Sequence, residues 1–270
     1  MSTATAPMDI GRVTLTVHDL TRTADFYARA LGLEKLAADT AEVSLGAGNR
    51  ALVTLVADPA ARQHSPREAG LFHTAFLMPS RAALGAWVHH ASNTRLPVQG
   101  ASDHKVSEAL YLADPEGNGI EVYVDRPRSA WTRADGSIQM TTEPHDINDL
   151  AAAATAPWAG APDGTVVGHV HLQVGSVPEA EAFYAGTLGF AITAHYPGAA
   201  FYGSGGYHHH LATNVWNSRG ATARSPSTGL AAVEILADPT SLAAITARSG
   251  GATDLVDPWG TRITLTAKAA

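Results

Sequence analysis

The sequence contains no cysteine. This absence excludes disulfide frameworks, thiolate zinc sites, iron–sulfur clusters and cysteine nucleophiles, so a bound metal would need His, Asp, Glu or Tyr ligands. Basic residues are also few, with 18 Lys plus Arg against 25 Asp plus Glu and a formal net charge of −7. Because the chain has no basic run either, we expect neither nucleic acid nor an anionic membrane as a partner.

Long apolar runs are missing as well. No apolar segment reaches the roughly 18 residues of a membrane-spanning helix, and the N-terminal MSTATAPMDI lacks a basic-then-apolar signal. These absences predict a cytoplasmic protein. What is present is a globular composition, with 45% hydrophobic residues in a chain of 270, enough for two domains. Thirteen histidines are many for such a chain, and their positions indicate its function.

The chain contains an internal repeat. The segments RVTLTVHDLTRTADFYARALG at 12–32 and HVHLQVGSVPEAEAFYAGTLG at 169–189 share a Phe-Tyr pair and a Leu-Gly pair at one constant offset. A second match joins DPEG at 114–117 to DPWG at 257–260, each followed by a β-type run. The two halves of the chain are therefore homologous to each other.

Hydrophobic periodicity divides each half into two modules. Apolar residues alternate as in a strand over 13–17, then follow helical spacing up to Gly32. The same order recurs, which predicts an α+β fold of four βαβββ modules at about 10–58, 70–126, 165–217 and 228–266. A segment rich in Pro, Ala, Thr and Asp lies between modules two and three. We predict a domain at 1–126, a linker at 127–164 with one or two short helical turns, and a domain at 165–270.

Two modules place a histidine at the same strand position. Counting back 14 residues from the helix aromatic gives His73 in module two and His169 in module three, whereas modules one and four have arginine and alanine there. Seven residues after the DPxG aspartate, module two has Glu121, where module four has threonine. Two histidines and one carboxylate on one face are the ligands that an oxygen-activating non-haem iron requires.

These positions leave some alternatives open. His169 and His171 project to the same face of one strand, so residue type cannot choose between them, although the 14-residue count favours His169. Glu121 could be an exposed residue of an edge strand, but on an apolar strand a buried carboxylate needs a cation or hydrogen-bond partners. His73 alone would be an ordinary core histidine, and its match with the other two positions favours a ligand.

With these motifs the chain resembles the vicinal-oxygen-chelate superfamily, which includes glyoxalases, fosfomycin and bleomycin resistance proteins and extradiol dioxygenases. The FYxxxLG helices and the DPxGNGIE turn carry this resemblance over nearly the whole chain. The segments DHKVSEALYLADPEGNGIEVYVDRP and GGYHHHLATNVW are more specific and look like two-domain catechol 2,3-dioxygenases. The resemblance implies that paired modules curl into two cups, with a metal held in a cup.

The resemblance also implies an acid–base residue in the run His208-His209-His210. In extradiol dioxygenases a histidine immediately before the following strand lies beside the oxygen site, and His209 matches that position best. A shift of one residue would select His208 or His210 instead. Histidines on a surface hairpin are the structural alternative.

Two further site residues follow from the resemblance. Tyr111 precedes Glu121 by ten residues, the spacing at which the family carries an active-site tyrosine. His104 fits the family's other site histidine, two residues out of strict register, so a small loop difference is assumed. Both would hydrogen-bond the substrate oxygens, and an ordinary strand aromatic is the alternative for Tyr111.

The resulting prediction is an Fe(II)-dependent extradiol dioxygenase of aromatic catabolism, which cleaves a catechol ring next to its hydroxyls with O2. His73, His169 and Glu121 would hold the iron, and Mn(II) suits the same ligands. One alternative is a glyoxalase-like metal-dependent isomerase or epimerase, which typically needs two carboxylates. The other is a metal-free small-molecule-binding module of the resistance type, which needs no such ligand set.

Modules one and four lack a ligand residue at the equivalent strand positions, and this predicts how the modules pair. Neither modules one and two nor modules three and four would complete the ligand set, whereas module two with module three supplies it and places His104 and Tyr111 opposite His209. We therefore predict one metal cup from modules two and three and a metal-free cup from modules one and four, formed within one chain or between subunits. Exposed sheet edges in such a fold further predict a homo-oligomer.

Overall fold

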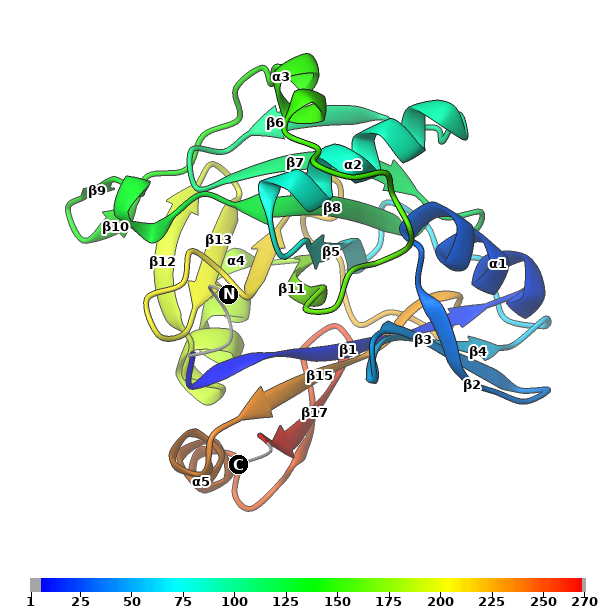
Figure 1. The fold of residues 1–270 in the computed structure, drawn as a ribbon. Helices are drawn as coiled ribbons and strands as arrows, with labels where there is room; N and C mark the ends of the chain where they lie inside the picture. Colours follow the sequence, from blue (N-terminus) through cyan, green and yellow to red (C-terminus); the bar gives the residue numbers. More distant parts are fainter. Residues whose placement is uncertain (1–5, 269–270) are drawn as a thin grey trace.

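The computed structural model describes residues 6–268, where the elements follow the predicted order (Figure 1). Module one contains β1 (Met8–Val17), α1 (Leu20–Leu31), β2 (Glu34–Ala38), β3 (Glu42–Ala47) and β4 (Arg50–Ala57). Module two contains β5 (Gly70–Leu77), α2 (Arg81–Asn93), β6 (Gly100–Asp103), β7 (Ser107–Ala113) and β8 (Gly119–Asp125).

Modules three and four lie after the linker. Module three contains β11 (Val166–Gln173), α4 (Val177–Glu181), the π-helical segment η2 (Ala182–Thr187), β12 (Ala191–Tyr196), β13 (Ala199–Gly203) and β14 (Leu211–Asn214). Module four contains β15 (Gly229–Ala237), α5 (Pro239–Arg248), β16 (Asp254–Val256) and β17 (Arg262–Ala267). Among the described residues, module four thus has one strand fewer than predicted, because residues 249–256 between its helix and its DPxG turn are too few for two strands.

The linker is more structured than its composition predicts. It contains the 3₁₀ turn η1 (Arg128–Ala130), the strands β9 (Arg133–Ala134) and β10 (Ser137–Ile138), and α3 (Ile147–Ala152). The two short helical segments agree with the prediction, whereas the β9–β10 hairpin was not expected. β10 contacts β12, so the hairpin lies against module three (Figure 1).

Local sequence sets the ends of the first helix. The side chain of Asp19 accepts a hydrogen bond from the backbone N–H of Arg22, and Gly32 ends α1 in the left-handed conformation at φ 67°. A side chain at position 32 would also collide with the linker backbone at Gly160 and Ala161. No helix within residues 6–268 combines the length and apolar character needed to span a lipid bilayer.

Within residues 6–268 the strands form two large curled sheets besides the small hairpin. One sheet, with the order β16-β17-β15-β1-β4-β3-β2, combines modules one and four. The other, with the order β12-β13-β14-β11-β5-β8-β7-β6, combines modules two and three. This confirms the pairing that the ligand pattern predicts, and it occurs within one chain. The division into domains at 1–126 and 165–270 stays a prediction, as does the homo-oligomer, and each sheet takes strands from both segments.

The repeated motifs explain how the modules are joined. Asp114 and Asp257 each accept hydrogen bonds from the backbone N–H groups two and four residues later, which fixes the DPxG turn. The tyrosine of the preceding FYxxxLG motif donates to the other carboxylate oxygen, Tyr27 to Asp114 at 3.4 Å and Tyr184 to Asp257 at 2.8 Å. These buried bonds connect module one to two and module three to four, whereas the sheets connect the other pairs.

Candidate metal centre

Three adjacent strands of the second sheet bring the predicted ligands to one face. In the register of this sheet, Ala75 of β5 lies between Glu121 of β8 and His169 of β11. Cross-strand partners project to the same face, and His73 shares it because it lies two residues before Ala75. Ala75 is fully buried and carries only a methyl group, so the three larger side chains can meet over it.

The three side chains form a buried cluster. His73 Nε2 lies 3.0 Å from Glu121 Oε2, and His169 Nε2 lies 3.3 Å from the same oxygen. One potential ligand atom from each residue lies within 4.8 Å of the others. The predicted proximity of His73 and His169 is therefore confirmed.

The chemistry of this cluster fits a divalent metal ion. His73 Nε2 is buried and has no hydrogen-bond partner, although it lies close to the Glu121 carboxylate. Burial lowers the pKa of His169 to about 4, so this imidazole is neutral near pH 7. Burial by itself would raise the pKa of Glu121, but the neighbouring His169 and His73 hold it well below its usual range. An ionised carboxylate and a neutral imidazole are the states in which these groups bind metal.

His171 has a different environment from His169. Asn214 Nδ2 donates a hydrogen bond to His171 Nε2 at 3.0 Å, which occupies the lone pair that a metal would use. The ring packs against Phe72 and Trp216, with centroids 4.9 Å and 5.5 Å away. The converging ligand atoms come from His169 and do not include His171.

A cavity of about 580 Å³ opens beside the cluster. Its wall contains the six residues singled out in the sequence: His73, His104, Tyr111, Glu121, His169 and His209. A cavity of this size accommodates a small organic ligand. The cup formed by modules two and three therefore brings together the residues that the sequence places far apart.

His104 and Tyr111 form a hydrogen-bonded pair in the cavity wall. A carbonyl oxygen can only accept, so His104 Nδ1 donates to the backbone oxygen of Thr141 at 2.6 Å. In neutral His104, Nε2 then accepts from the Tyr111 hydroxyl at 2.6 Å. Burial, with a contribution from the Glu121 charge, raises the pKa of Tyr111 well above its usual value, so the phenol is protonated. His104 lies in the turn between β6 and β7, where a shift in register is easily accommodated.

The histidine run alternates as predicted. His209 lines the cavity, and its ring centroid lies 4.1 Å from that of His169. His208 and His210 do not belong to the cavity lining that the described residues form. Both are fully buried: His208 bonds to Asp125, and His210 Nδ1 accepts the backbone N–H of Ser204 at 3.2 Å. The surface-hairpin alternative is therefore wrong, because all three side chains are buried.

The linker supplies a wall of the cavity that the sequence does not reveal. Residues 137–142 line it together with Phe201 of β13 and Trp216, which lies in the turn after β14. Ile138 is buried there, and Met140 is partly buried. The only signal in this segment is its composition, which is that of a connection, so its position over the cup could not be predicted.

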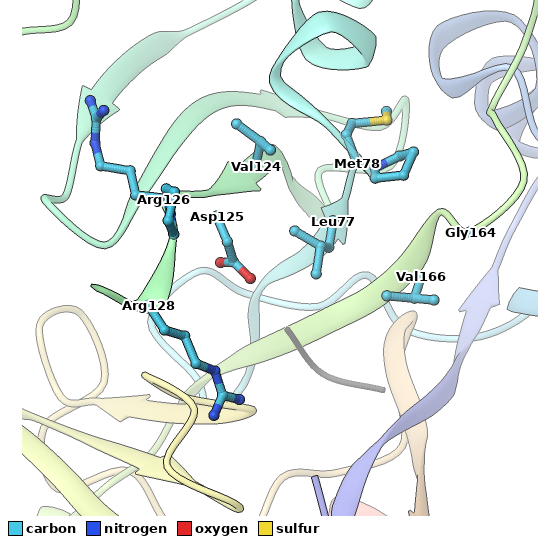
Figure 2. Close-up of a pocket in the computed structure, with 10 residues that line it drawn as sticks. Leu77, Met78, Val124, Asp125, Arg126, Arg128, Gly164 and Val166 are labelled. Atoms are coloured by element: carbon cyan, nitrogen blue, oxygen red, sulfur yellow. The ribbon is translucent and has the colours of Figure 1, made fainter. Parts of the chain in front are cut away.

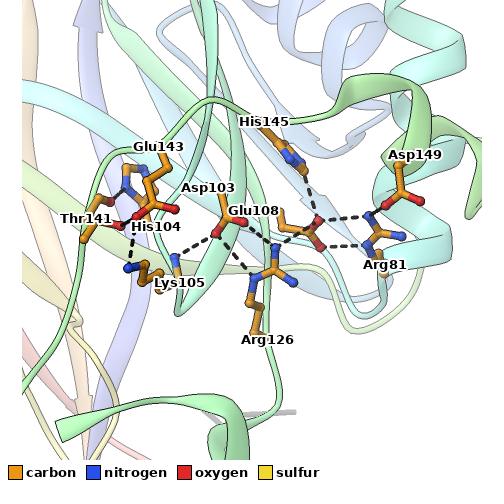
Figure 3. Close-up of polar contacts among 10 residues, drawn as sticks. All are labelled: Arg81, Asp103, His104, Lys105, Glu108, Arg126, Thr141, Glu143, His145 and Asp149. Atoms are coloured by element: carbon orange, nitrogen blue, oxygen red, sulfur yellow. Dashed lines mark hydrogen bonds and ion pairs between the residues drawn. The ribbon is translucent and has the colours of Figure 1, made fainter.

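A buried carboxylate holds the linker against module two (Figure 3). Glu108 of β7 is 2% exposed and accepts two hydrogen bonds from Arg81, at 2.8 Å and 3.0 Å. Its Oε1 also lies 3.5 Å from Arg126 and 3.5 Å from His145, which precedes α3. The Glu108 hydrogen bonds raise the pKa of Arg81 further above its usual value.

We expect Glu108→Gln to destabilise the protein by about 2 kcal/mol, because the buried carboxylate loses its charge-assisted hydrogen bonds to Arg81. Glu143→Gln is the matched control. Glu143 pairs with Lys105 at 3.0 Å, but both side chains are about half exposed, so this change should cost at most ~0.5 kcal/mol. Urea unfolding of both variants measures the difference, and equal midpoints would contradict this role of Glu108.

The buried histidines predict that acid destabilises the metal-free protein. Burial is the main cause that lowers the pKa of four of them below the usual imidazole value: His169, His171, His209 and His210. In the unfolded chain these histidines bind protons near pH 6.5, whereas in the folded protein they stay neutral. Lowering the pH therefore reduces the free energy of unfolding by up to ~1.4 kcal/mol per histidine and pH unit. The Tm of metal-free protein should therefore fall steeply from pH 7 to pH 5. In His210→Gln the fall should be shallower, and a Tm that stays constant over this range would contradict the prediction.

Fold and site together place the chain in a known family. Residues 9–122 and 166–261 match the Glyoxalase/Bleomycin resistance protein/Dioxygenase superfamily, and the protein belongs to it. This confirms the resemblance found in the sequence. The chain is also 42% identical over 218 residues to a catechol-2,3-dioxygenase of Bacillus subtilis (strain 168), covering 78% of this chain and 76% of that protein.

Solved structures support the same fold. A putative dioxygenase from Bacillus subtilis superposes with a TM-score of 0.67 at 14% identity, covering 97% of this chain and 86% of that one. Glyoxalase I from Zea mays superposes with a TM-score of 0.59 at 18% identity, covering 96% of this chain and 92% of that one. At such low sequence identity, these superpositions establish the two-cup fold and carry no information about activity.

Proposed function

We propose that the protein is an Fe(II)-dependent extradiol dioxygenase that opens a catechol ring next to its two hydroxyl groups with O2. The observation that carries this proposal is the convergence of His73, Glu121 and His169 in the wall of a cavity that also contains His209. Such a set is typical of non-haem iron oxygenases, and Mn(II) suits it as well. The 42% identity to a catechol-2,3-dioxygenase supports the same reaction class.

The side chains of the cavity fit this chemistry. Bound iron would supply the one-electron chemistry that lets O2 react with an aromatic ring. The paired His104 and Tyr111 would orient the substrate hydroxyls by hydrogen bonds. His209 is neutral because burial lowers its pKa well below the usual value, so it can accept a substrate proton and return it to the product.

The alternatives fit the site less well. Within the described residues the cluster contains one carboxylate, whereas a glyoxalase-like isomerase or epimerase typically uses two. A metal-free binding module would not need two buried imidazoles that converge on one buried carboxylate.

The test is to load metal-free protein with Fe(II) under argon and then assay it in air with catechol and with 3- and 4-substituted catechols. We expect one iron per chain, a yellow muconic semialdehyde-type product and one O2 consumed per ring opened. A parallel loading with Mn(II) identifies the active metal. Failure to bind either metal, with no product from any catechol, would overturn the proposal and favour the metal-free module.

The cavity lining also predicts which catechols are accepted. Its described residues include aromatic and aliphatic side chains, such as Ile138, Phe201 and Trp216, but no Lys or Arg. A carboxylate on the substrate ring would therefore lie there without a cation, at a cost of more than ~1.4 kcal/mol. We expect kcat/KM for alkyl- and aryl-substituted catechols to exceed that for carboxylated catechols at least about tenfold.

A cation introduced into the linker wall tests this preference. Met140→Lys should raise kcat/KM for carboxylated catechols relative to uncharged ones, whereas Met140→Leu should leave the ratio as in the wild type. Equal kcat/KM values for both substrate classes in the wild type would contradict the prediction without affecting the assignment of the metal ligands.

A further inference from the structure

His209 is the end of a hydrogen-bonded chain that crosses the wall of the cup. His208 Nδ1 lies 2.7 Å from His209 Nδ1, and His208 Nε2 lies 2.8 Å from Asp125 Oδ1. Asp125 is the last residue of β8 and lines a second cavity, of about 470 Å³ (Figure 2). The chain from Asp125 through His208 to His209 therefore leads from this second cavity to the one that contains the metal cluster.

The chemistry of these contacts determines where the protons lie. A carboxylate only accepts, so His208 Nε2 donates to Asp125. When His208 carries only this one ring proton, its Nδ1 has a lone pair and accepts from His209. His209 Nδ1 therefore carries the proton of that ring, and its Nε2 keeps a lone pair.

The surrounding contacts keep this chain in one arrangement. Tyr207 donates a second hydrogen bond to Asp125 Oδ1 at 3.1 Å and itself contacts the Tyr123 hydroxyl at 2.8 Å. The fully buried His208 ring packs between Tyr207 and Trp131, with centroids 4.1 Å and 5.1 Å away. Because His208 is bonded to Asp125 and packed against two aromatic rings, its hydrogen bond holds His209 in one orientation.

We propose that Asp125 and His208 are positioning residues that fix the orientation of His209 and its Nδ1-protonated tautomer. The tautomer assignment stands on these hydrogen bonds and on a single ring proton on His208. Its catalytic consequence rests on the proposed function: with a lone pair on Nε2, His209 begins each turnover able to accept a substrate proton. Sequence patterns give no sign of this, because Asp125 and His208 lie in different modules.

The tautomer can be measured without any reaction. In metal-free protein labelled with ¹⁵N-histidine, the His209 signals, assigned by their loss in His209→Asn, should show a protonated Nδ1 and an unprotonated Nε2. Asp125→Asn and His208→Leu should convert this into a mixture of tautomers. His208→Gln should preserve it, because the amide can donate to Asp125 and accept from His209. His210→Gln is the matched control, since His210 is equally buried but is not bonded to His209.

Kinetics of the iron-loaded enzyme provide the second measurement. Asp125→Asn and His208→Leu should lower kcat about tenfold, with KM and iron content unchanged, and His208→Gln should restore most of kcat. A wild-type His209 protonated on Nε2, or a tautomer that does not change in Asp125→Asn, would overturn the proposal. If His208→Leu does not fold, Asp125→Asn and His208→Gln still decide it. The NMR spectra need neither iron nor catechol. The tautomer can therefore still be tested if the dioxygenase proposal proves wrong.

Discussion

His169→Ala is expected to lose stoichiometric iron and all measurable ring cleavage, while His171→Gln keeps its iron. Both histidines are buried on the same strand, but only His169 Nε2 converges with His73 and Glu121. Removing one of three protein ligands leaves too few to retain the ion, whereas His171 Nε2 is already bonded to Asn214. Glu121→Gln should resemble His169→Ala, because it removes the only negative charge of the cluster.

Metal analysis after gel filtration measures this difference, and circular dichroism shows whether each variant is folded. His169→Ala should keep the native spectrum, because Ala75 of the neighbouring strand already shows that the sheet tolerates a methyl group on this face. Full iron content in His169→Ala, or loss of iron in His171→Gln, would contradict this assignment and favour His171 as the metal ligand.

Much of this site could be predicted from the sequence because its residues lie on regular strands. Strand periodicity and the constant offset of the repeat determine which residues face the cup, so His73, Glu121 and His169 could be placed before the structure was known. The absence of ligands in modules one and four was enough to pair module two with module three, and the β5–β11 ladder confirms this.

The remaining features depend on contacts between segments without a repeating pattern. The hairpin at Arg133–Ile138 and the cavity wall that follows it have no counterpart in the other modules. The bond from Asp125 to His208 joins two residues 83 positions apart. Neither contact leaves a periodic signal, so only the three-dimensional arrangement of the linker and the modules reveals them.

His209→Asn is expected to lower kcat by roughly 10²-fold or more, the usual scale for loss of a general acid–base residue, with iron content and catechol affinity unchanged. Asparagine retains hydrogen-bonding capacity toward His208 but cannot be protonated, so the substrate proton has no acceptor at this position. Single-turnover kinetics on the iron-loaded variant, with catechol bound before O2 is admitted, separate the proton-transfer steps from binding.

The comparison with neighbouring variants identifies the residue that acts. His210→Asn should keep the wild-type kcat, because His210 bonds to the backbone of Ser204 outside the cavity lining. His208→Asn should have an intermediate effect, since His208 touches the cavity only through His209. A 10²-fold loss in His208→Asn or His210→Asn, with His209→Asn close to wild type, would mean that the register of the histidine run differs from that proposed. If instead the three variants follow the expected order, the proton acceptor is His209, and its two neighbours serve the fold and its orientation.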